Sequence, residues 1–218
     1  MDNYRSKIEL HNIDCMEFMK TCKDNQFDLA IVDPPYMDSF NTDNWVASNA
    51  KQKNYKNRQE TLTNKKPNKE YFHELMRVSK NQIIWGGNYF TLPISRGWIF
   101  WLKNQSNNYF SDGELAWTSF DRVLKVFDFH WSGMLQGDMK NKEIKIHPTQ
   151  KPKQLYKWLL NNYAEKGQSI LDTHFGSLSI GLACDELGFD LTACELDKDY
   201  FEAGKKRLDL ARRQTSLF

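Results

Sequence analysis

The chain has 218 residues, which is enough for one domain with a sizeable core. Because 40% of the residues are hydrophobic and 14% are aromatic, the composition excludes a disordered chain. The formal net charge of +2 does not by itself indicate a nucleic-acid partner. The sequence shows no apolar stretch of membrane-spanning length and no signal peptide, so we expect a soluble, cytoplasmic protein.

The first half of the chain alternates apolar and amphipathic stretches. Residues 27–32 (FDLAIV) form a continuous apolar run, typical of a strand that is buried on both faces. Residues 37–69 are polar and predict a long loop. The remaining elements expected here are a strand at 7–13, a helix at 14–20, a helix at 70–79, and strands at 82–87 and 97–102.

The second half continues the alternation. We expect residues 114–120 and 123–129 to form two strands that pair with each other. The later elements are a helix at 153–164, a strand at 169–172, a helix at 178–187, a strand at 191–196 and a helix at 198–212. Repeated strand–helix units predict an α/β fold with a parallel sheet covered by helices on both sides.

Acidic residues follow four of the predicted strands, namely Asp14, Asp33, Asp172 and Glu195. Ligands of parallel sheets bind at the carboxyl ends of the strands, so these acids are candidates for a binding site. For Asp14 and Asp172, helix capping is the alternative.

Asp33, Pro34, Pro35 and Tyr36 (DPPY) directly follow the buried strand. The prolines fix φ and make a stiff corner, which presents a carboxylate, a free carbonyl at Pro34 and an aromatic plane. Two acceptors beside a stacking face fit an exocyclic amino group on a planar base. A plain Pro-Pro turn after a core strand is the alternative.

Asp172 opens the stretch LDTHFGSLSIG, in which small residues separate a strand from a helix. Glu195 lies 23 residues after Asp172, a distance that suits hydrogen bonds to ribose hydroxyls in a nucleotide-binding βαβ unit. The four cysteines show no metal or redox spacing, and neither do the five histidines, so we expect free thiols and no metal.

Three ordered motifs, DPPY at 33–36, HPTQKP at 147–152 and LDTHFGSLSIG at 171–181, resemble those of DNA amino-methyltransferases. These enzymes use S-adenosylmethionine (AdoMet) and methylate adenine N6 or cytosine N4. The motif order resembles the permuted β class, and QIIWGGNYF, RGWIFWLKN and SDGELAWTSF resemble its phage and prophage branch. The resemblance implies a Rossmann-like methyltransferase with a doubly wound, mostly parallel seven-stranded sheet, in a single domain over residues 1–218.

The resemblance also implies roles for individual residues. Asp33, Pro34, Pro35 and Tyr36 would hold the target base, and an Asp in the first position is more typical of adenine N6 enzymes than of cytosine N4 enzymes. The residues expected at the cofactor are Asp14, Asp33, Lys151, Asp172, His174, Gly176, Ser177, Glu195 and Leu196, with Lys151 near the methionine carboxylate.

Two basic stretches hint at a polyanion, although solvated surface is the alternative for each. The first, at 51–69, lies in the 37–69 loop, and the second, at 140–153, begins in a small recognition region at about 121–146. The residues expected at double-stranded DNA are Lys51, Lys53, Lys56, Arg58, Arg122, Lys125, Lys140, Lys142 and Lys145. A homodimer is left open, and the branch resembled favours a bacterium or its phage as the source.

Leu178 departs from the family pattern, which has glycine where the backbone approaches the cofactor. Either the loop shifts slightly, or AdoMet binding is weakened, and the second outcome makes a non-catalytic DNA-binding relative one alternative to adenine N6 methylation. Methylation of cytosine N4 or of RNA is the other alternative.

Overall fold

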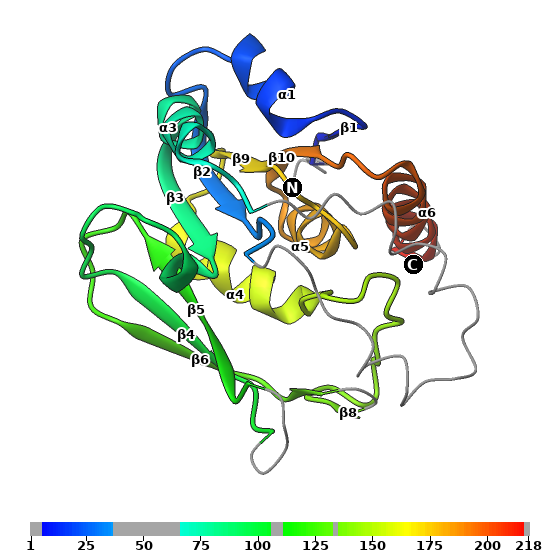
Figure 1. Cartoon of the computed structure of the whole chain (residues 1–218). Coiled ribbons are helices and arrows are strands. Elements are labelled where there is room, and N and C mark those ends of the chain that lie inside the picture. The colour runs from blue at the N-terminus through cyan, green and yellow to red at the C-terminus, as the bar shows by residue number, and fades with distance from the viewer. Residues whose placement is uncertain (1–5, 37–65, 106–110, 133–134, 216–218) are drawn as a thin grey trace.

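The structure, a computed structural model, describes residues 6–36, 66–105, 111–132 and 135–215 (Figure 1). Its helices are α1 (Cys15–Thr21), α3 (Lys69–Val78), α4 (Lys153–Tyr163), α5 (Ser179–Leu187) and α6 (Lys198–Thr215), with a 3₁₀ turn, η2, at Gly87–Tyr89. Within these ranges, no helix is long and apolar enough to cross a membrane. The four cysteines are free thiols, as expected.

Eight strands form one sheet in the order β1-β10-β9-β2-β3-β5-β4-β6. Their bounds are β1 (Ile8–His11), β2 (Phe27–Val32), β3 (Ser79–Trp85), β4 (Trp98–Leu102), β5 (Gly113–Thr118), β6 (Lys125–Asp128), β9 (Ser169–Asp172) and β10 (Asp190–Cys194). A separate two-stranded ribbon joins β7 (Trp131–Ser132) and β8 (Leu135–Gln136). The mostly parallel α/β architecture is confirmed.

Two details of the predicted sheet are wrong. The sheet has eight strands among the described residues rather than seven, because β6 adds to its edge beside β4. The expected pair at 114–120 and 123–129 does not form. Both edges of β5 are taken by β3 and β4, so β6 pairs in parallel with β4 instead.

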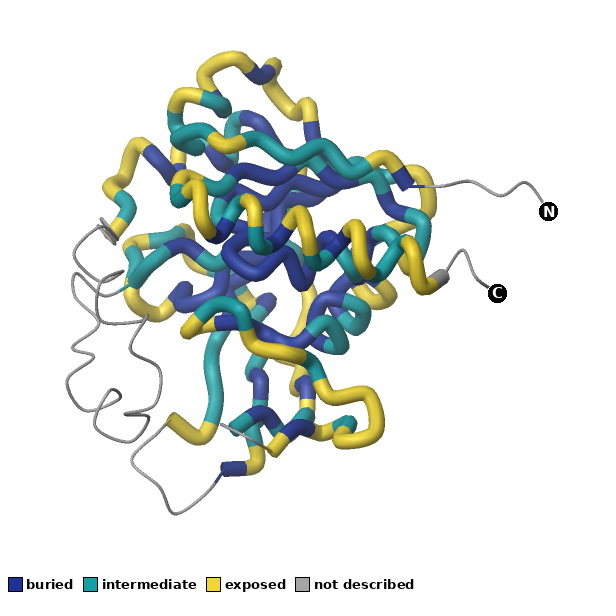
Figure 2. Tube along the Cα trace, turned by 90° about the vertical axis from the view of Figure 1, so that its right-hand side faces the viewer, coloured by how far each residue is buried: buried dark blue, intermediate teal, exposed yellow. Residues whose placement is uncertain are grey.

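Helices cover both faces of the sheet, as the buried run in β2 predicts (Figure 1). Leu29 and Ile31 point into one core with α4, α5 and α6. Ala30 and Val32 point into a second core with α1 and α3. Successive strand residues face opposite sides, so a strand between two helical layers must be apolar throughout. Figure 2 shows the buried residues gathered in the centre of the molecule, between exposed outer turns.

The strand register brings the four predicted acids together at the carboxyl ends of the parallel strands, which we call the carboxyl edge. His11 pairs with Cys194, Ala193 with Asp172, and Ala30 with Leu171, so β1, β10, β9 and β2 end at similar heights. Asp14, Glu195, Asp172 and Asp33 therefore leave the sheet side by side. The expectation that one edge gathers these acids is confirmed.

The antiparallel strand β5 adds another acid to the same edge. It runs against β3, with Ala116 opposite Trp85, so its beginning at Gly113 lies beyond the end of β3. Leu102, the last residue of β4, pairs with Gly113. Glu114 and Lys103 consequently sit at the carboxyl edge of the parallel strands, next to the corner formed by DPPY.

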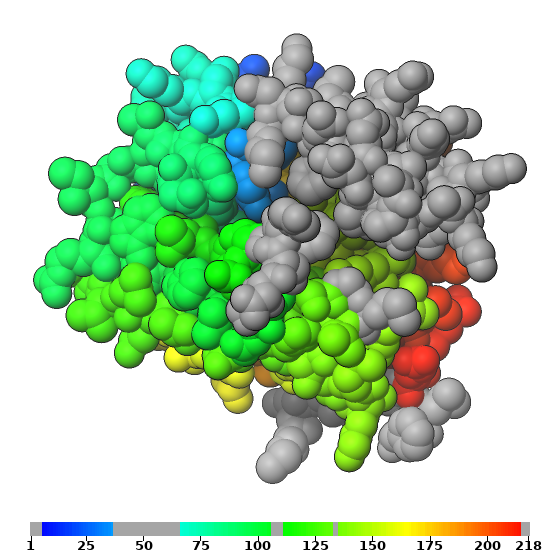
Figure 3. Space-filling model, turned by 60° about the horizontal axis from the view of Figure 1, so that its bottom comes forward, coloured from blue at the N-terminus to red at the C-terminus, as the bar shows by residue number. Residues whose placement is uncertain are grey.

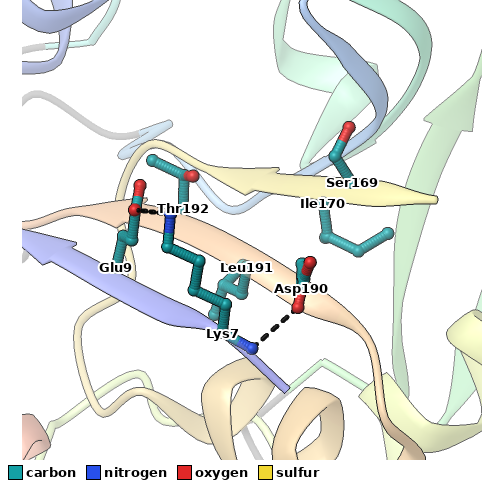
Figure 4. Close-up of a pocket in the computed structure, with 7 residues that line it drawn as sticks. All are labelled: Lys7, Glu9, Ser169, Ile170, Asp190, Leu191 and Thr192. Carbon is teal, nitrogen blue, oxygen red and sulfur yellow. Dashed lines mark hydrogen bonds and ion pairs between the residues drawn. The ribbon is translucent and has the colours of Figure 1, made fainter. Parts of the chain in front are cut away.

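The opposite edge of the sheet carries a shallow hollow of about 160 Å³ (Figure 4). Lys7, Ser169 and Asp190 line it beside the beginnings of β1, β9 and β10. The backbone N–H of Lys7 donates to Asp190 Oδ1 at 2.7 Å, and Lys7 Nζ lies 2.5 Å from Glu9 Oε1. These polar groups pair with one another, so the hollow does not compete with the carboxyl edge as a candidate site.

Candidate active site

The corner after β2 holds a buried carboxylate whose two oxygens have different surroundings. Asp33 Oδ2 lies 2.5 Å from Lys151 Nζ, and Lys151 is only 4% exposed. Asp33 Oδ1 is also buried, yet it has no hydrogen-bond partner among the described residues. A buried oxygen without a partner is costly, so its presence indicates an acceptor that is kept open for a ligand.

Lys151 reaches this carboxylate from HPTQKP, the loop that leads into α4. Its Nζ also lies 3.0 Å from Glu114 Oε2, an ion pair without hydrogen-bond geometry. The other Glu114 oxygen is paired with Lys103. The resemblance implied Lys151 at the cofactor carboxylate, whereas the structure pairs it with Asp33 and Glu114. Sequence reasoning missed Glu114 and Lys103; their one signal is a charge at the end of an otherwise apolar strand.

The charges in this cluster oppose the effect of burial. Burial raises the pKa of Asp33, and the nearby Lys151 charge offsets this only in part. Burial would also raise the pKa of Glu114, but Lys151 and Lys103 outweigh it and bring that pKa to about 2. Burial would lower the pKa of Lys151, yet Asp33 and Glu114 raise it well above its usual value. Asp33 is therefore the carboxylate here that protonates first as pH falls.

Tyr36 forms a face-to-face stack with Tyr89 of η2. Their ring centroids are 4.9 Å apart and the planes differ by 6°. Gly86, at a φ of +66°, lies against the same ring, and a Cβ there would stand 2.4 Å from Tyr36 Cδ1. Only glycine leaves room for the ring at this position. This ring placement goes beyond a plain Pro-Pro turn, and sequence reasoning missed Tyr89.

A second acidic group lies where β9 and β10 end. Asp172 is 2% exposed, and its Oδ1 accepts from the His174 N–H at 3.0 Å. Glu195 Oε2 accepts from the Gly176 N–H, and Oε1 accepts from the Asp197 N–H, both at 2.9 Å. Glu195 therefore ties the loop at 173–178, which we call the glycine loop, to the end of β10. Both acids remain able to accept further hydrogen bonds.

The capping alternative is correct for one acid and wrong for the other. Asp14 caps α1, because its Oδ1 accepts from the N–H groups of Met16 and Glu17 at 2.8 and 3.2 Å. Asp172 caps no helix, since α5 begins at Ser179 and its N-cap position is Leu178. The Asp172 carboxyl group is instead buried at the carboxyl edge of the sheet.

Burial raises the pKa of Asp172 to about 8, and the nearby charges of Asp33 and Glu195 contribute to the rise. Burial likewise raises the pKa of Glu195. Carboxyl groups held this close to one another in a buried place favour a ligand that carries positive charge and hydroxyl donors.

The other residues expected at the cofactor divide into two groups. His174 and Ser177 have polar partners in the protein: His174 Nδ1 lies 2.9 Å from Thr173 Oγ1, and Ser177 Oγ lies 3.1 Å from Ser179 Oγ. The His174 ring also packs edge-on against Tyr71 of α3. Leu196, beside Glu195, is 58% exposed and is free to contact a ligand. His147 of HPTQKP was missed, although its ring lies 3.4 Å from the position of a Cβ on Gly176.

The basic residues expected at DNA lie in three places. Lys140, Lys142 and Lys145 follow β8, and Figure 3 shows their yellow-green segment at the surface beside α6 in red. All three side chains are exposed, and the Lys145 ammonium group lies 4.9 Å from the centre of the Trp131 ring. Arg122 instead donates to the Asn162 carbonyl at 2.7 Å near the end of α4, and Lys125 begins β6. Lys51, Lys53, Lys56 and Arg58 lie outside the described residues, like all of the predicted loop up to residue 65.

A family model of N6/N4 methyltransferases, described as DNA methylase, matches residues 40–206. This chain belongs to the DNA methylase family. The match begins after Tyr36, so the role of the tetrapeptide in this methylase rests on its geometry.

The curated relatives of the methylase match over short stretches. The Type II methyltransferase M.HpaI of Haemophilus parainfluenzae is 36% identical over 69 residues, which are 32% of this chain and 22% of that protein. The DNA adenine methyltransferase YhdJ of Escherichia coli is 31% identical over 86 residues, 39% of this chain and 28% of that protein. The chain thus spans less than a third of the length of these relatives.

Solved structures resemble the methylase over most of its length. The M1.HpyAVI–SAM complex has a TM-score of 0.59 and 20% identity, covering 93% of this chain and 99% of that chain. The cytosine-N4-specific PvuII DNA methyltransferase has a TM-score of 0.61 and 14% identity, covering 96% and 93%. At these identities the likeness shows the fold, which is the AdoMet-methyltransferase fold that the sequence predicts.

Leu178, the departure from the family pattern, does not face the carboxyl edge. It adopts the left-handed conformation, with φ 57° and ψ 32°, and it is fully buried in the core with α5 and α6. A Cβ at Gly181 would stand 2.7 Å from Leu178 Cγ, and one at Gly204 would stand 3.1 Å from Leu178 Cβ. Two helix glycines thus make room for the side chain, and the expected weakening of cofactor binding loses its steric reason.

We predict that Leu178→Ala lowers the free energy of unfolding by about 2–4 kcal/mol, because it removes a fully buried side chain and leaves a cavity. Urea unfolding measures the change, with Leu210→Ala as the matched control because Leu210 is exposed on α6. Unchanged stability together with tighter AdoMet binding would contradict this and return Leu178 to the cofactor side.

We predict that Asp172→Asn stabilises the protein without ligand, by an amount that grows with pH. The folded pKa of about 8 lies far above the ordinary aspartate value, so the folded state retains a proton that the unfolded state loses. Stability from this group is complete in acid and is lost as pH rises toward 8. Thermal unfolding at about pH 5 and about pH 8 should show a larger gain at the higher pH; an equal gain at both would contradict the raised pKa.

Proposed function

We propose that this methylase transfers a methyl group from AdoMet to the N6 amino group of adenine in double-stranded DNA. The observation that carries the proposal is the buried Asp33 Oδ1, which has no partner among the described residues although Lys151 holds the other oxygen. An amine on a purine ring is a poor nucleophile, because its lone pair is delocalised into the ring. A hydrogen bond from the amine to Oδ1 helps to turn that lone pair toward an electrophile.

The rest of the corner supports a planar base as the substrate. The Pro34 carbonyl offers a second acceptor, and the Tyr36 ring offers a stacking surface that Tyr89 holds in position. A base inside a duplex cannot bring its amino group to a buried carboxylate, so the target nucleotide must swing out of the helix. Binding it between fixed groups supplies the proximity that in-line transfer requires.

The acids at β9 and β10 fit AdoMet as the cofactor. When bound, AdoMet supplies an electrophilic methyl group on a positively charged sulfur, and it also carries an ammonium group and two ribose hydroxyls. Asp172 is buried and needs a cation to ionise, while Glu195 retains acceptor capacity for hydroxyl groups. Leu196 offers exposed apolar surface beside Glu195. Asp33 lies on the neighbouring strand, so donor and acceptor groups would meet at one edge.

Lys140, Lys142 and Lys145 support DNA as the polymer. They are exposed on the segment that follows β8, where they can neutralise phosphates and position the duplex. The name of the relative YhdJ specifies adenine, and an Asp in the first position of DPPY is more typical of adenine N6 enzymes. The recognition region at 121–146 and a bacterial or phage origin stay predictions, and a homodimer stays open.

We predict that expression in a host without DNA methylases produces N6-methyladenine in one short sequence motif and that Asp33→Ala abolishes it. Sequencing the host DNA with detection of modified bases reads both the base and the motif. Asp24→Ala is the matched control, because its side chain is 75% exposed and lies before β2, at the end of that strand opposite DPPY. N4-methylcytosine in place of N6-methyladenine would refute the choice of base, and DNA that stays unmodified would refute the reaction.

We predict that AdoMet binds more tightly as pH rises toward about 8. Below that pH the Asp172 carboxyl group is protonated, and binding a cation beside it must first release the proton. Calorimetry in buffers of different ionisation enthalpy measures both the affinity and the protons released. In Asp172→Asn the affinity should be lower and independent of pH over this range; proton release that persists there would assign the effect to another group.

A further inference from the structure

Four charged side chains of alternating sign form a line at the catalytic corner, in the order Lys103, Glu114, Lys151 and Asp33. Lys103 pairs with one oxygen of Glu114, and Lys151 lies between Glu114 Oε2 at 3.0 Å and Asp33 Oδ2 at 2.5 Å. We call these four residues the charge chain. Their side chains are 3–20% exposed, with Lys151 the most buried.

The charge chain contains more charged groups than are needed to neutralise a buried Asp33. A Lys151–Asp33 pair would be neutral by itself, and each further buried charge adds a desolvation cost. Glu114 nevertheless approaches the same ammonium group from β5, and Lys103 at the end of β4 balances Glu114. The Lys151 ammonium is thereby divided between two carboxylates. Asp33 has its positive partner on one oxygen only, and Oδ1 keeps its negative character.

We propose that Glu114 is a positioning residue for methyl transfer: by sharing Lys151, it keeps Asp33 a strong acceptor for the substrate amine. Without Glu114, Lys151 would move fully onto Asp33 and neutralise the carboxylate that the amine must contact. Lys103 has the opposite effect on Asp33. Its ammonium group pairs with Glu114 and so weakens the attraction between Glu114 and Lys151. This inference rests on the proposed function, since it concerns the same carboxylate.

Among the described residues, the other titratable groups near the charge chain include Lys145, which lies near Lys103, and four groups near Lys151 or Asp33. Tyr36 and Tyr156 face Lys151 and stay neutral below strongly alkaline pH, because burial raises their pKa values. His147 also faces Lys151, and burial together with that charge lowers its pKa to about 4. Asp172 interacts with Asp33 and Lys151 and has a pKa of about 8 without ligand. Saturating AdoMet removes the Asp172 titration from the measurement, so the acid limb of the rate reports Asp33.

The test is the pH profile of single-turnover methyl transfer to DNA at saturating AdoMet. In Glu114→Gln, the loss of a negative charge beside Asp33 should move the acid limb to lower pH and reduce the plateau rate about tenfold or more. In Lys103→Met, the loss of a cation should move the acid limb to higher pH. The double variant removes one charge of each sign, and its acid limb should return close to that of the wild type.

Glu9→Gln is the matched control, because Glu9 pairs with Lys7 at the opposite edge of the sheet (Figure 4). It should leave the profile unchanged. An acid limb that stays in place in both Glu114→Gln and Lys103→Met would overturn the inference, and so would an unreduced plateau in Glu114→Gln. If Glu114→Gln does not fold, Lys103→Met alone decides by the direction of its shift. A wild type that transfers no methyl group would instead overturn the proposed function, so the two failures are distinct.

Discussion

The ion pair between Lys151 and Asp33 is the contact on which the arrangement of the DPPY corner depends. It joins two motifs that are more than a hundred residues apart, and both partners are withdrawn from solvent. Such a pair is stable only where its geometry is good and its neighbours supply further charge. The parallel sheet meets this condition because the ends of β2 and β3, the start of β5 and the loop before α4 converge at one edge.

The same edge concentrates acids that would otherwise repel. Asp172 and Glu195 receive backbone N–H groups from the glycine loop, while Asp33 and Glu114 share the ammonium group of Lys151. These partners offset only part of the free energy that burying the ionised acids costs, and the raised pKa of Asp172 reflects the part that remains. A ligand with positive charge lowers that cost. Relief of this unfavourable burial therefore contributes to the free energy with which the ligand binds.

The packing behind the glycine loop shows how this chain accommodates a bulky residue in a tight turn. A left-handed leucine costs roughly 1–2 kcal/mol of backbone energy. Gly181 and Gly204 offset it, because their missing side chains open a core site that the Leu178 side chain fills. Arg207, also on α6, donates to the Ser177 carbonyl at 2.8 Å and pairs with Glu143 at 2.5 Å. Arg207 thus connects the glycine loop to α6 and to the segment that carries Lys140, Lys142 and Lys145.

The sequence by itself determined the main helices and strands, the fold class and the four acids at strand ends, because hydrophobic periodicity is a local signal. It did not determine the short ribbon of β7 and β8 or the partner of β6, which depend on contacts between distant segments. It also singled out Asp33 and Tyr36, since two prolines restrict the backbone wherever they occur. Only the tertiary structure decided that Glu114 meets Lys151, that Tyr89 stacks on Tyr36 and that His147 rests on Gly176. Those contacts join residues that are far apart along the chain, so no local pattern predicts them. The direction of the Leu178 side chain depends on a left-handed φ, which the local sequence does not indicate for a leucine.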